Sequence, residues 1–148
     1  MSTTVTNKLE IILANSYILY LKTQNYHWNV RGANFMSLHL LFQDQYTDLA
    51  SAIDEIAERI VTLGSHAIGS YKAFSKLAKI KEVDDSEYLN SNAMLQDLIS
   101  SQEVLVVLLK EVIAVATEQK DDATIDLCAE RIAKHEKNIW MLTSSIHK

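Results

Sequence analysis

Residues 34–64, NFMSLHLLFQDQYTDLASAIDEIAERIVTLG, carry the pattern that decides the fold. Apolar side chains recur through this stretch with the period of one buried helix face. The recurring residues are Leu38, Leu41, Phe42, Leu49, Ile53, Ile56, Ile60 and Leu63. Asn34 is a suitable N-cap and Gly64 a suitable stop, so the stretch predicts a helix of about 28 residues.

The same period predicts three more long helices. The first covers residues 4–28, another follows the cap signal at 84–86, and the last starts at 120–122. Residues 69–83 are less regular and predict a short helix that crosses between two long ones. Four long helices with one extended connection describe the ferritin-like bundle, and growth-hormone-like bundles with two crossovers are the competing topology.

The composition agrees with an all-α chain that forms one domain over residues 1–148. Proline is absent and there are only three glycines, so long helices are uninterrupted and tight β-turns have few residues to build them. The chain is long enough to bury a core without disulfides, and the single Cys128 suits a reducing cytosol. The first residues lack a secretory signal and no apolar run is long enough to span a membrane, so we expect a soluble, cytoplasmic protein.

The charge favours cations over nucleic acids as partners. The net charge is -5, from 19 acidic and 14 basic residues. Lys8 is the only basic residue before Lys22, and the chain ends in Ile146-His147-Lys148. Neither end therefore carries a basic cluster that would bind phosphates.

Two histidines and two carboxylates form a candidate set of metal ligands. His27 ends the first predicted helix, His39 lies on the second, and Asp54 and Glu58 follow on that helix four residues apart. Imidazole and carboxylate together suit ferrous iron. Around the helix, His39, Asp54 and Glu58 fall within about 100° of one another, so these three residues share a face.

Along the helix axis, however, His39 and Glu58 are about 28 Å apart, so one metal ion cannot touch both within one chain. Either the residues are unrelated, or a second copy packs antiparallel about a two-fold axis near Thr47 and completes two equivalent sites. A histidine at a helix end is often a cap, and an Asp/Glu pair at this spacing is often a solvated face, so both interpretations stay open. An intrachain di-iron centre is disfavoured, because none of the five histidines has a glutamate three residues before it.

Five segments resemble the signature of the Dps family of mini-ferritins. They are HWNVRGANF at 27–35, LH at 38–39, DEIAER at 54–59, KDD at 120–122 and HEKNIWML at 135–142. The segments stand in the family's order and cover nearly the whole chain. The resemblance implies a hollow dodecamer that oxidises Fe(II), preferentially with hydrogen peroxide rather than dioxygen, stores the ferric mineral and protects against oxidative stress.

The resemblance also assigns the ligands of the ferroxidase centre. It implies that His27 and His39 of one subunit bind iron together with Asp54 and Glu58 of the two-fold mate. Where the family usually has an acidic residue four positions after the second histidine, this chain has Gln43, followed by Asp44. A neutral amide is a weaker ligand, so the second iron of each centre is expected to bind loosely or through water, or the metal preference differs.

Two further groups of residues carry expectations. Trp28 is either plain core or, by resemblance, a residue that quenches radicals from peroxide chemistry. Asp121, Asp122 and Asp126 open the last helix, where the helix dipole is sufficient to explain carboxylates. In Dps proteins acids at these positions line three-fold pores, so the resemblance implies an entry pore that concentrates cations. The other residues predicted to pack in the core are Tyr26, Trp140, Met36, Met94 and Met141.

Two other functions stay open. Some Dps proteins coat DNA through lysine-rich tails, so a DNA-compacting protein with little ferroxidase activity is the alternative. Tails this poor in charge release few counterions and are not expected to bind DNA tightly. The third hypothesis is a helical shell whose metal centre has decayed, with Gln43 as the first sign.

Overall fold

The computed structural model describes residues 3–147 and has five α-helices within that range. They are α1 (Thr3–Asn29), α2 (Phe35–Thr62), α3 (Tyr71–Leu77), α4 (Ser91–Glu118) and α5 (Asp122–Ser144). No strand occurs in the described range, which confirms the all-α prediction. Met1, Ser2 and Lys148, which belong to the predicted domain and its tails, lie outside the described residues.

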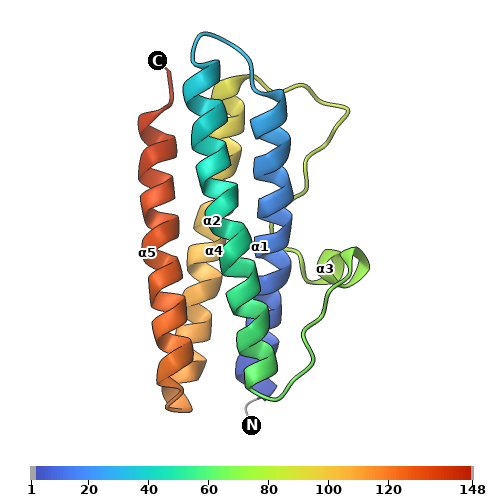
Figure 1. The fold of residues 1–148 in the computed structure, drawn as a ribbon, viewed down its shortest axis with the longest axis vertical. Helices are drawn as coiled ribbons and strands as arrows, with labels where there is room; N and C mark the ends of the chain where they lie inside the picture. The colour runs from blue at the N-terminus through green and yellow to red at the C-terminus, as the bar shows by residue number, and fades with distance from the viewer. Residues whose placement is uncertain (1–2, 148) are drawn as a thin grey trace.

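The four long helices form a bundle with a single crossover (Figure 1). α1 runs antiparallel to α2, and α4 runs antiparallel to α5. α2 and α4 run in the same direction because the chain returns along the whole bundle between them, with α3 lying outside the bundle beside α1. This arrangement confirms the ferritin-like topology over the bundle with two crossovers. Within the described residues, no helix combines the length and the apolar character that a membrane span needs.

α2 starts and stops where its sequence pattern predicts. Asn34 is the residue at the N-cap, but its side chain makes no capping hydrogen bond. Its carbonyl accepts instead from the Leu38 amide at 3.0 Å and from the Ser37 hydroxyl at 3.0 Å. At the other end Gly64 has a φ of 93°, in the left-handed region that favours glycine. Its amide donates to the Val61 carbonyl at 2.9 Å, and the chain leaves the helix there.

α4 begins later than its sequence pattern predicts. The predicted cap signal forms an isolated turn, in which Asp84 Oδ1 accepts from the amide of Ser86 at 3.0 Å and from its hydroxyl at 2.6 Å. The helix starts at Ser91, because the side chain of Asn90 accepts from the Ala93 amide at 2.9 Å. The predicted start was wrong because Asp and Ser cap a local turn as readily as a helix.

Asn15 anchors the crossover to α1. Its Oδ1 accepts from the amides of Lys79 at 2.7 Å and Ile80 at 2.9 Å, and its Nδ2 donates to the Leu77 carbonyl at 3.3 Å. The Asn15 side chain is buried, so these bonds replace the hydrogen bonds to water that its polar atoms lose on burial. They hold the end of α3 against α1, where Phe74 is also buried.

Burial divides the residues that were expected to pack in the core. Tyr26 and Met94 are buried, as predicted, and Met141 is half-buried. Met36 and Trp140 are 60% and 63% exposed, so the prediction that they are core residues was wrong. Each lies two positions from buried residues of its own helix, and therefore on the opposite side of the helix from the core.

Candidate metal centre

His27 and His39 face each other across the short connection between α1 and α2. Their ring centroids are 3.7 Å apart and the ring planes differ by 11°. Nδ1 of His27 lies 2.6 Å from the carbonyl oxygen of His39, and Nδ1 of His39 lies 2.7 Å from the carbonyl oxygen of His27. This reciprocal pair of hydrogen bonds ties the end of α1 to the start of α2.

The reciprocal bonds fix which nitrogen of each ring is protonated. A carbonyl oxygen can only accept, so each Nδ1 must carry a proton and donate it. Each neutral ring then keeps its lone pair on Nε2. Metal-binding histidines have this arrangement when a backbone carbonyl orients the ring. The pair can therefore offer two nitrogen ligands without a change of tautomer.

Two aromatic rings border the histidine pair. His27 is buried and His39 is half-buried. The Tyr46 ring packs edge-on against His27 with a centroid distance of 5.2 Å, and the Phe35 ring stacks on His39 at 5.0 Å. Neither neighbour was predicted from the sequence, although Tyr46 follows His39 by two helix turns and so lies on the same face. The rings restrict rotation of both imidazoles.

Asp54 and Glu58 lie on the exposed side of α2, one turn apart. Within residues 3–147 neither carboxylate makes a hydrogen bond or an ion pair. The helix rises about 28 Å from His39 to Glu58. No group of three or more His, Cys, Asp or Glu residues in the described range lies close enough to hold a metal ion. One subunit therefore brings the two histidines together and leaves the two carboxylates apart from them.

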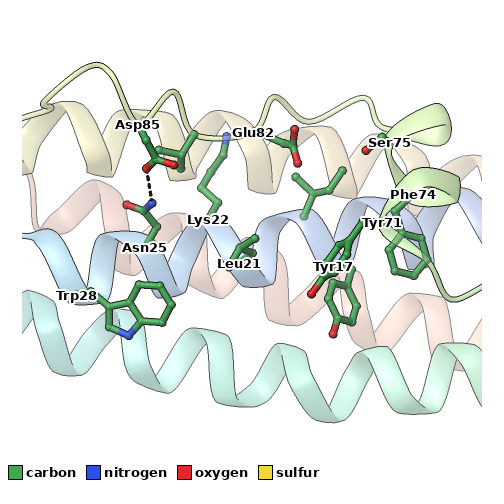
Figure 2. Close-up of a pocket in the computed structure, with 12 residues that line it drawn as sticks. Tyr17, Leu21, Lys22, Asn25, Trp28, Tyr71, Phe74, Ser75, Glu82 and Asp85 are labelled. Atoms are coloured by element: carbon green, nitrogen blue, oxygen red, sulfur yellow. Dashed lines mark hydrogen bonds between the residues drawn. The ribbon is translucent and has the colours of Figure 1, made fainter.

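Gln43, Asp44 and Trp28, the other residues expected near the metal site, are exposed in the single subunit. Gln43 and Asp44 lie about one turn beyond His39 on α2. Trp28 is 59% exposed, so it is not a core residue of the subunit. It lines one end of a pocket of about 380 Å³ between α1 and the crossover, and Phe74 lies at the opposite end (Figure 2).

The three aspartates at the start of α5 differ in their surroundings. Asp121 pairs with Arg59 at 2.7 Å and caps α5, accepting from the amide of Thr124 at 3.2 Å and from its hydroxyl at 2.6 Å. Burial alone would raise the pKa of Asp121, but the Thr124 bonds and the Arg59 charge outweigh it and hold the pKa below its usual value. Asp122 and Asp126 are exposed and form no such contacts within the described residues. The contacts of Asp121 within the subunit are therefore sufficient to explain an acidic residue at this position.

A second histidine site lies in the bundle core. His135 donates from Nδ1 to Gln102 Oε1 at 2.5 Å, and its Nε2 accepts from Arg131 at 3.3 Å. Arg131 also pairs with Asp48 at 3.0 Å. Burial, helped by the Arg131 charge, lowers the pKa of His135 to about 3. His135 is therefore neutral with both ring nitrogens in use, which explains why it is not a ligand candidate.

The single-crossover bundle, with a histidine pair that leaves both Nε2 atoms open, defines a ferritin-like subunit. The family model described as the ferritin-like domain matches residues 6–148. The DNA protection during starvation protein of Brevibacillus brevis is 36% identical over 146 residues, which cover 96% of this chain and 97% of that protein. The chain belongs to the Dps family of ferritin-like proteins.

Solved structures of Dps proteins share the fold. The crystal structure of a Dps protein from Bacillus brevis matches with a TM-score of 0.92 and 34% identity, over 99% of this chain and 100% of that chain. The Dps protein of Vibrio cholerae O1 matches with a TM-score of 0.91 and 34% identity, over 97% of this chain and 89% of that chain. That protein is described as a member of a broad superfamily of ferritin-like diiron-carboxylate proteins.

Proposed function

We propose that this chain is an iron-oxidising and iron-storing mini-ferritin. In this proposal Fe(II) is bound by Nε2 of His27 and His39 from one subunit and by the carboxylates of Asp54 and Glu58 from a second. Hydrogen peroxide oxidises it, and the ferric mineral collects inside a closed homo-oligomer, the dodecamer of the Dps family. The observation that carries the proposal is the reciprocal His27–His39 pair, which holds both Nε2 atoms in the tautomer that binds a metal.

The exposed face of α2 supports pairing with a second copy. Met36 and Leu40 near one end of this face and Val61 near the other are 60%, 49% and 58% exposed, and large apolar side chains along one exposed helix face favour a protein contact. An antiparallel copy related by a two-fold axis near Thr47 would cover these residues. The same symmetry would place its Asp54 near His39 and complete two equivalent sites at once.

The charges and the electron count suit this chemistry. Two neutral imidazoles and two carboxylates would balance the charge of one Fe(II) ion and give it hard and borderline ligands. Two Fe(II) ions supply the two electrons that reduce one hydrogen peroxide to water, so no hydroxyl radical is released. Because Gln43 offers only a neutral amide, the second ion is expected to bind more weakly than the first.

The charge of the surface suggests a route by which Fe(II) would enter the oligomer. Exposed Asp122 and Asp126 at the start of α5 would attract Fe(II) toward an entry pore. We place the protein in the cytoplasm, where it would protect the cell by removing iron and peroxide. Removal of Fe(II) and peroxide would by itself protect DNA, which is the role that the names of several relatives describe. Tight DNA binding through tails is not expected from a net charge of -5.

A complementation experiment tests the shared site. His39→Ala and Asp54→Ala chains, with different tags, are expressed separately and together, loaded anaerobically with Fe(II) and given peroxide, and ferric absorbance is followed. Each variant alone loses both sites. In a mixed pair one site carries both substitutions and the other is intact, so random pairing should restore about a quarter of the wild-type rate.

The control mixture replaces His39→Ala with His66→Ala, a histidine outside the site, and should oxidise iron at well above that fraction. No recovery in the mixture of His39→Ala and Asp54→Ala would contradict the inter-subunit site. Wild-type protein that oxidises iron no faster than the Asp54→Ala variant would remove the ferroxidase proposal itself.

A further inference from the structure

A series of tyrosine rings in contact leads from the histidine pair to the surface of the subunit. Tyr46 packs edge-on against His27 at 5.2 Å, and its other neighbour is Tyr20 at 5.9 Å. Tyr20 contacts Tyr17 at 5.8 Å, and Tyr17 contacts Tyr71 at 6.2 Å. We call Tyr46, Tyr20, Tyr17 and Tyr71 the tyrosine ladder.

Helix geometry accounts for the alignment of the ladder. Tyr20 lies two turns before His27 on α1, and Tyr46 lies two turns after His39 on α2. Because α1 and α2 are antiparallel, Tyr20 and Tyr46 meet two helix turns away from the histidine pair along the bundle. Tyr17 lies one further turn along α1. There it meets Tyr71, and both line the pocket beside α3 (Figure 2).

The ladder connects a shielded site to solvent. Tyr46, Tyr20 and Tyr17 are half-buried, whereas Tyr71 is 73% exposed. Phenol is among the few side chains that lose one electron readily, and electron transfer slows steeply as the distance between donor and acceptor grows. Rings in edge contact therefore allow several short steps in place of one long one. Four of the six tyrosines of the chain lie in this series, while Tyr26 and Tyr88 have no ring contact with it.

We propose that the tyrosine ladder carries one-electron oxidising equivalents from the metal centre to the surface. This inference rests on the ferroxidase function proposed above. It applies when a centre holds a single Fe(II), which the neutral Gln43 favours. Peroxide then needs a second electron: Fe(II), hydrogen peroxide and the Tyr46 phenol give Fe(III), hydroxide, water and the Tyr46 phenoxyl radical. The phenol loses one electron and one proton, and no hydroxyl radical is released.

The radical then moves along the ladder by equal exchanges. Tyr20 gives one electron to the Tyr46 radical and releases its phenolic proton to its surroundings, while Tyr46 takes up a proton and becomes a phenol again. Tyr17 and Tyr71 then lose an electron and a proton in the same way. At Tyr71 a soluble ene-diol reductant such as ascorbate supplies the electron and proton that restore the phenol, and is itself oxidised by one electron. The centre is thereby cleared of oxidising equivalents without damage to the residues around it.

The test uses the assembled protein loaded with one Fe(II) per centre. Peroxide is added, samples are frozen at intervals with and without ascorbate, and the same samples are examined by electron paramagnetic resonance and for Fe(III). The variants are Tyr46→Phe, Tyr20→Phe and Tyr71→Phe, which keep the rings but remove the oxidisable hydroxyl. Tyr88→Phe, an exposed tyrosine outside the ladder, is the matched control.

Wild type and Tyr88→Phe should form a tyrosyl radical that ascorbate removes quickly, and Tyr46→Phe should form little of it. In Tyr20→Phe and Tyr71→Phe the radical should form but survive ascorbate about tenfold longer, because the missing step raises the barrier by about 1.4 kcal/mol or more. Iron oxidation without a tyrosyl radical, a tyrosyl radical as abundant in Tyr46→Phe as in the wild type, or unchanged decay in Tyr20→Phe would each overturn the ladder alone. Absence of iron oxidation in the wild type would overturn the ladder and the proposed function together.

Discussion

His27 and His39 each donate a hydrogen bond from Nδ1 to the backbone carbonyl of the other residue, at 2.6 and 2.7 Å. The backbone of one ligand candidate therefore orients the ring of the other. Both rings are held in one tautomer before any metal binds, so little reorganisation is needed when it does. The same bonds join α1 to α2, which makes the site and the helix pair depend on one another.

Replacing His39 should weaken Fe(II) binding without unfolding the site. In His39→Ala the carbonyl of residue 39 remains, so His27 keeps its acceptor and its orientation. Loss of the ligand should weaken the affinity for Fe(II) by about 100-fold or more, beyond the range seen when only an outer partner is removed. Anaerobic titration calorimetry measures this, with His66→Ala as control. Equal affinities in the two variants would exclude His39 as a ligand.

Gln43→Glu should increase the number of Fe(II) ions bound by each centre. Gln43 is exposed on α2, about one turn beyond His39, and a carboxylate there would add a charged oxygen ligand. We expect the weaker of two binding steps to tighten about tenfold, since a neutral oxygen is replaced by an anionic one. Calorimetry on Gln43→Glu and on the neighbouring Asp44→Asn separates this effect from general surface charge. A stoichiometry that does not respond would argue that position 43 lies outside the centre.

Asp121 and Asp126 should differ in their effect on stability. Asp121 caps α5 and pairs with Arg59, so Asp121→Ala should reduce the free energy of unfolding by about 1–2 kcal/mol. Exposed Asp126 makes no such contact within the described residues, and Asp126→Asn should change stability by less than about 0.5 kcal/mol. Urea unfolding at fixed protein concentration compares the two. If Asp126→Asn instead slows iron uptake at low salt, the pore role is supported.

Acid should destabilise the bundle through His135. Its pKa is about 3 in the folded chain against 6.5 for an ordinary histidine, because burial and the Arg131 charge oppose protonation. Between these values the unfolded chain binds a proton that the folded chain does not. Stability should therefore fall as the pH falls below 6.5, by up to about 1.4 kcal/mol per unit. The free energy of unfolding in urea, measured from pH 7 to 4, should change less steeply with pH in His135→Gln than in the wild type. Equal dependence on pH in the two proteins would show that His135 is not the cause.

Asp97 should be needed to keep a buried lysine in place. Lys22 is 3% exposed and its Nζ lies 3.1 Å from Asp97 Oδ2, while the Tyr26 hydroxyl donates to the same oxygen at 2.5 Å. Asp97→Asn leaves the lysine charge without its counter-ion and should cost about 2–3 kcal/mol of stability, less than a fully buried pair because Asp97 is partly exposed. Lys22→Met, which removes the charge, should cost less. Thermal unfolding of both variants checks the order.

Much of the fold was predictable because helix patterning is local. The apolar period of α2 and the glycine that follows it mark that helix correctly, and the single long connection indicates the topology. The start of α4 was not predictable in the same way. Asp84 and Ser86 satisfy each other in a turn, and only the path of the chain afterwards shows that Asn90 is the cap.

Part of the site was also predictable, because the rise of a helix is fixed. The distance along α2 from His39 to Glu58 already excludes a complete site in one chain. The exposure of Met36 and Trp140 was not predicted, because the prediction followed their apolar character and not their helical position, two residues from buried side chains of the same helix.

The sequence by itself determined the helices, their order and the separation of the two histidines from the two candidate carboxylate ligands, since each depends on spacing along one element. The tertiary structure decided the contacts between elements: the exchanged hydrogen bonds of His27 and His39, the tyrosine ladder beside them, and the neutral state of His135. These contacts join residues from different helices and depend on helix pairing and side-chain rotamers. A linear pattern of apolar and polar residues does not encode either of them.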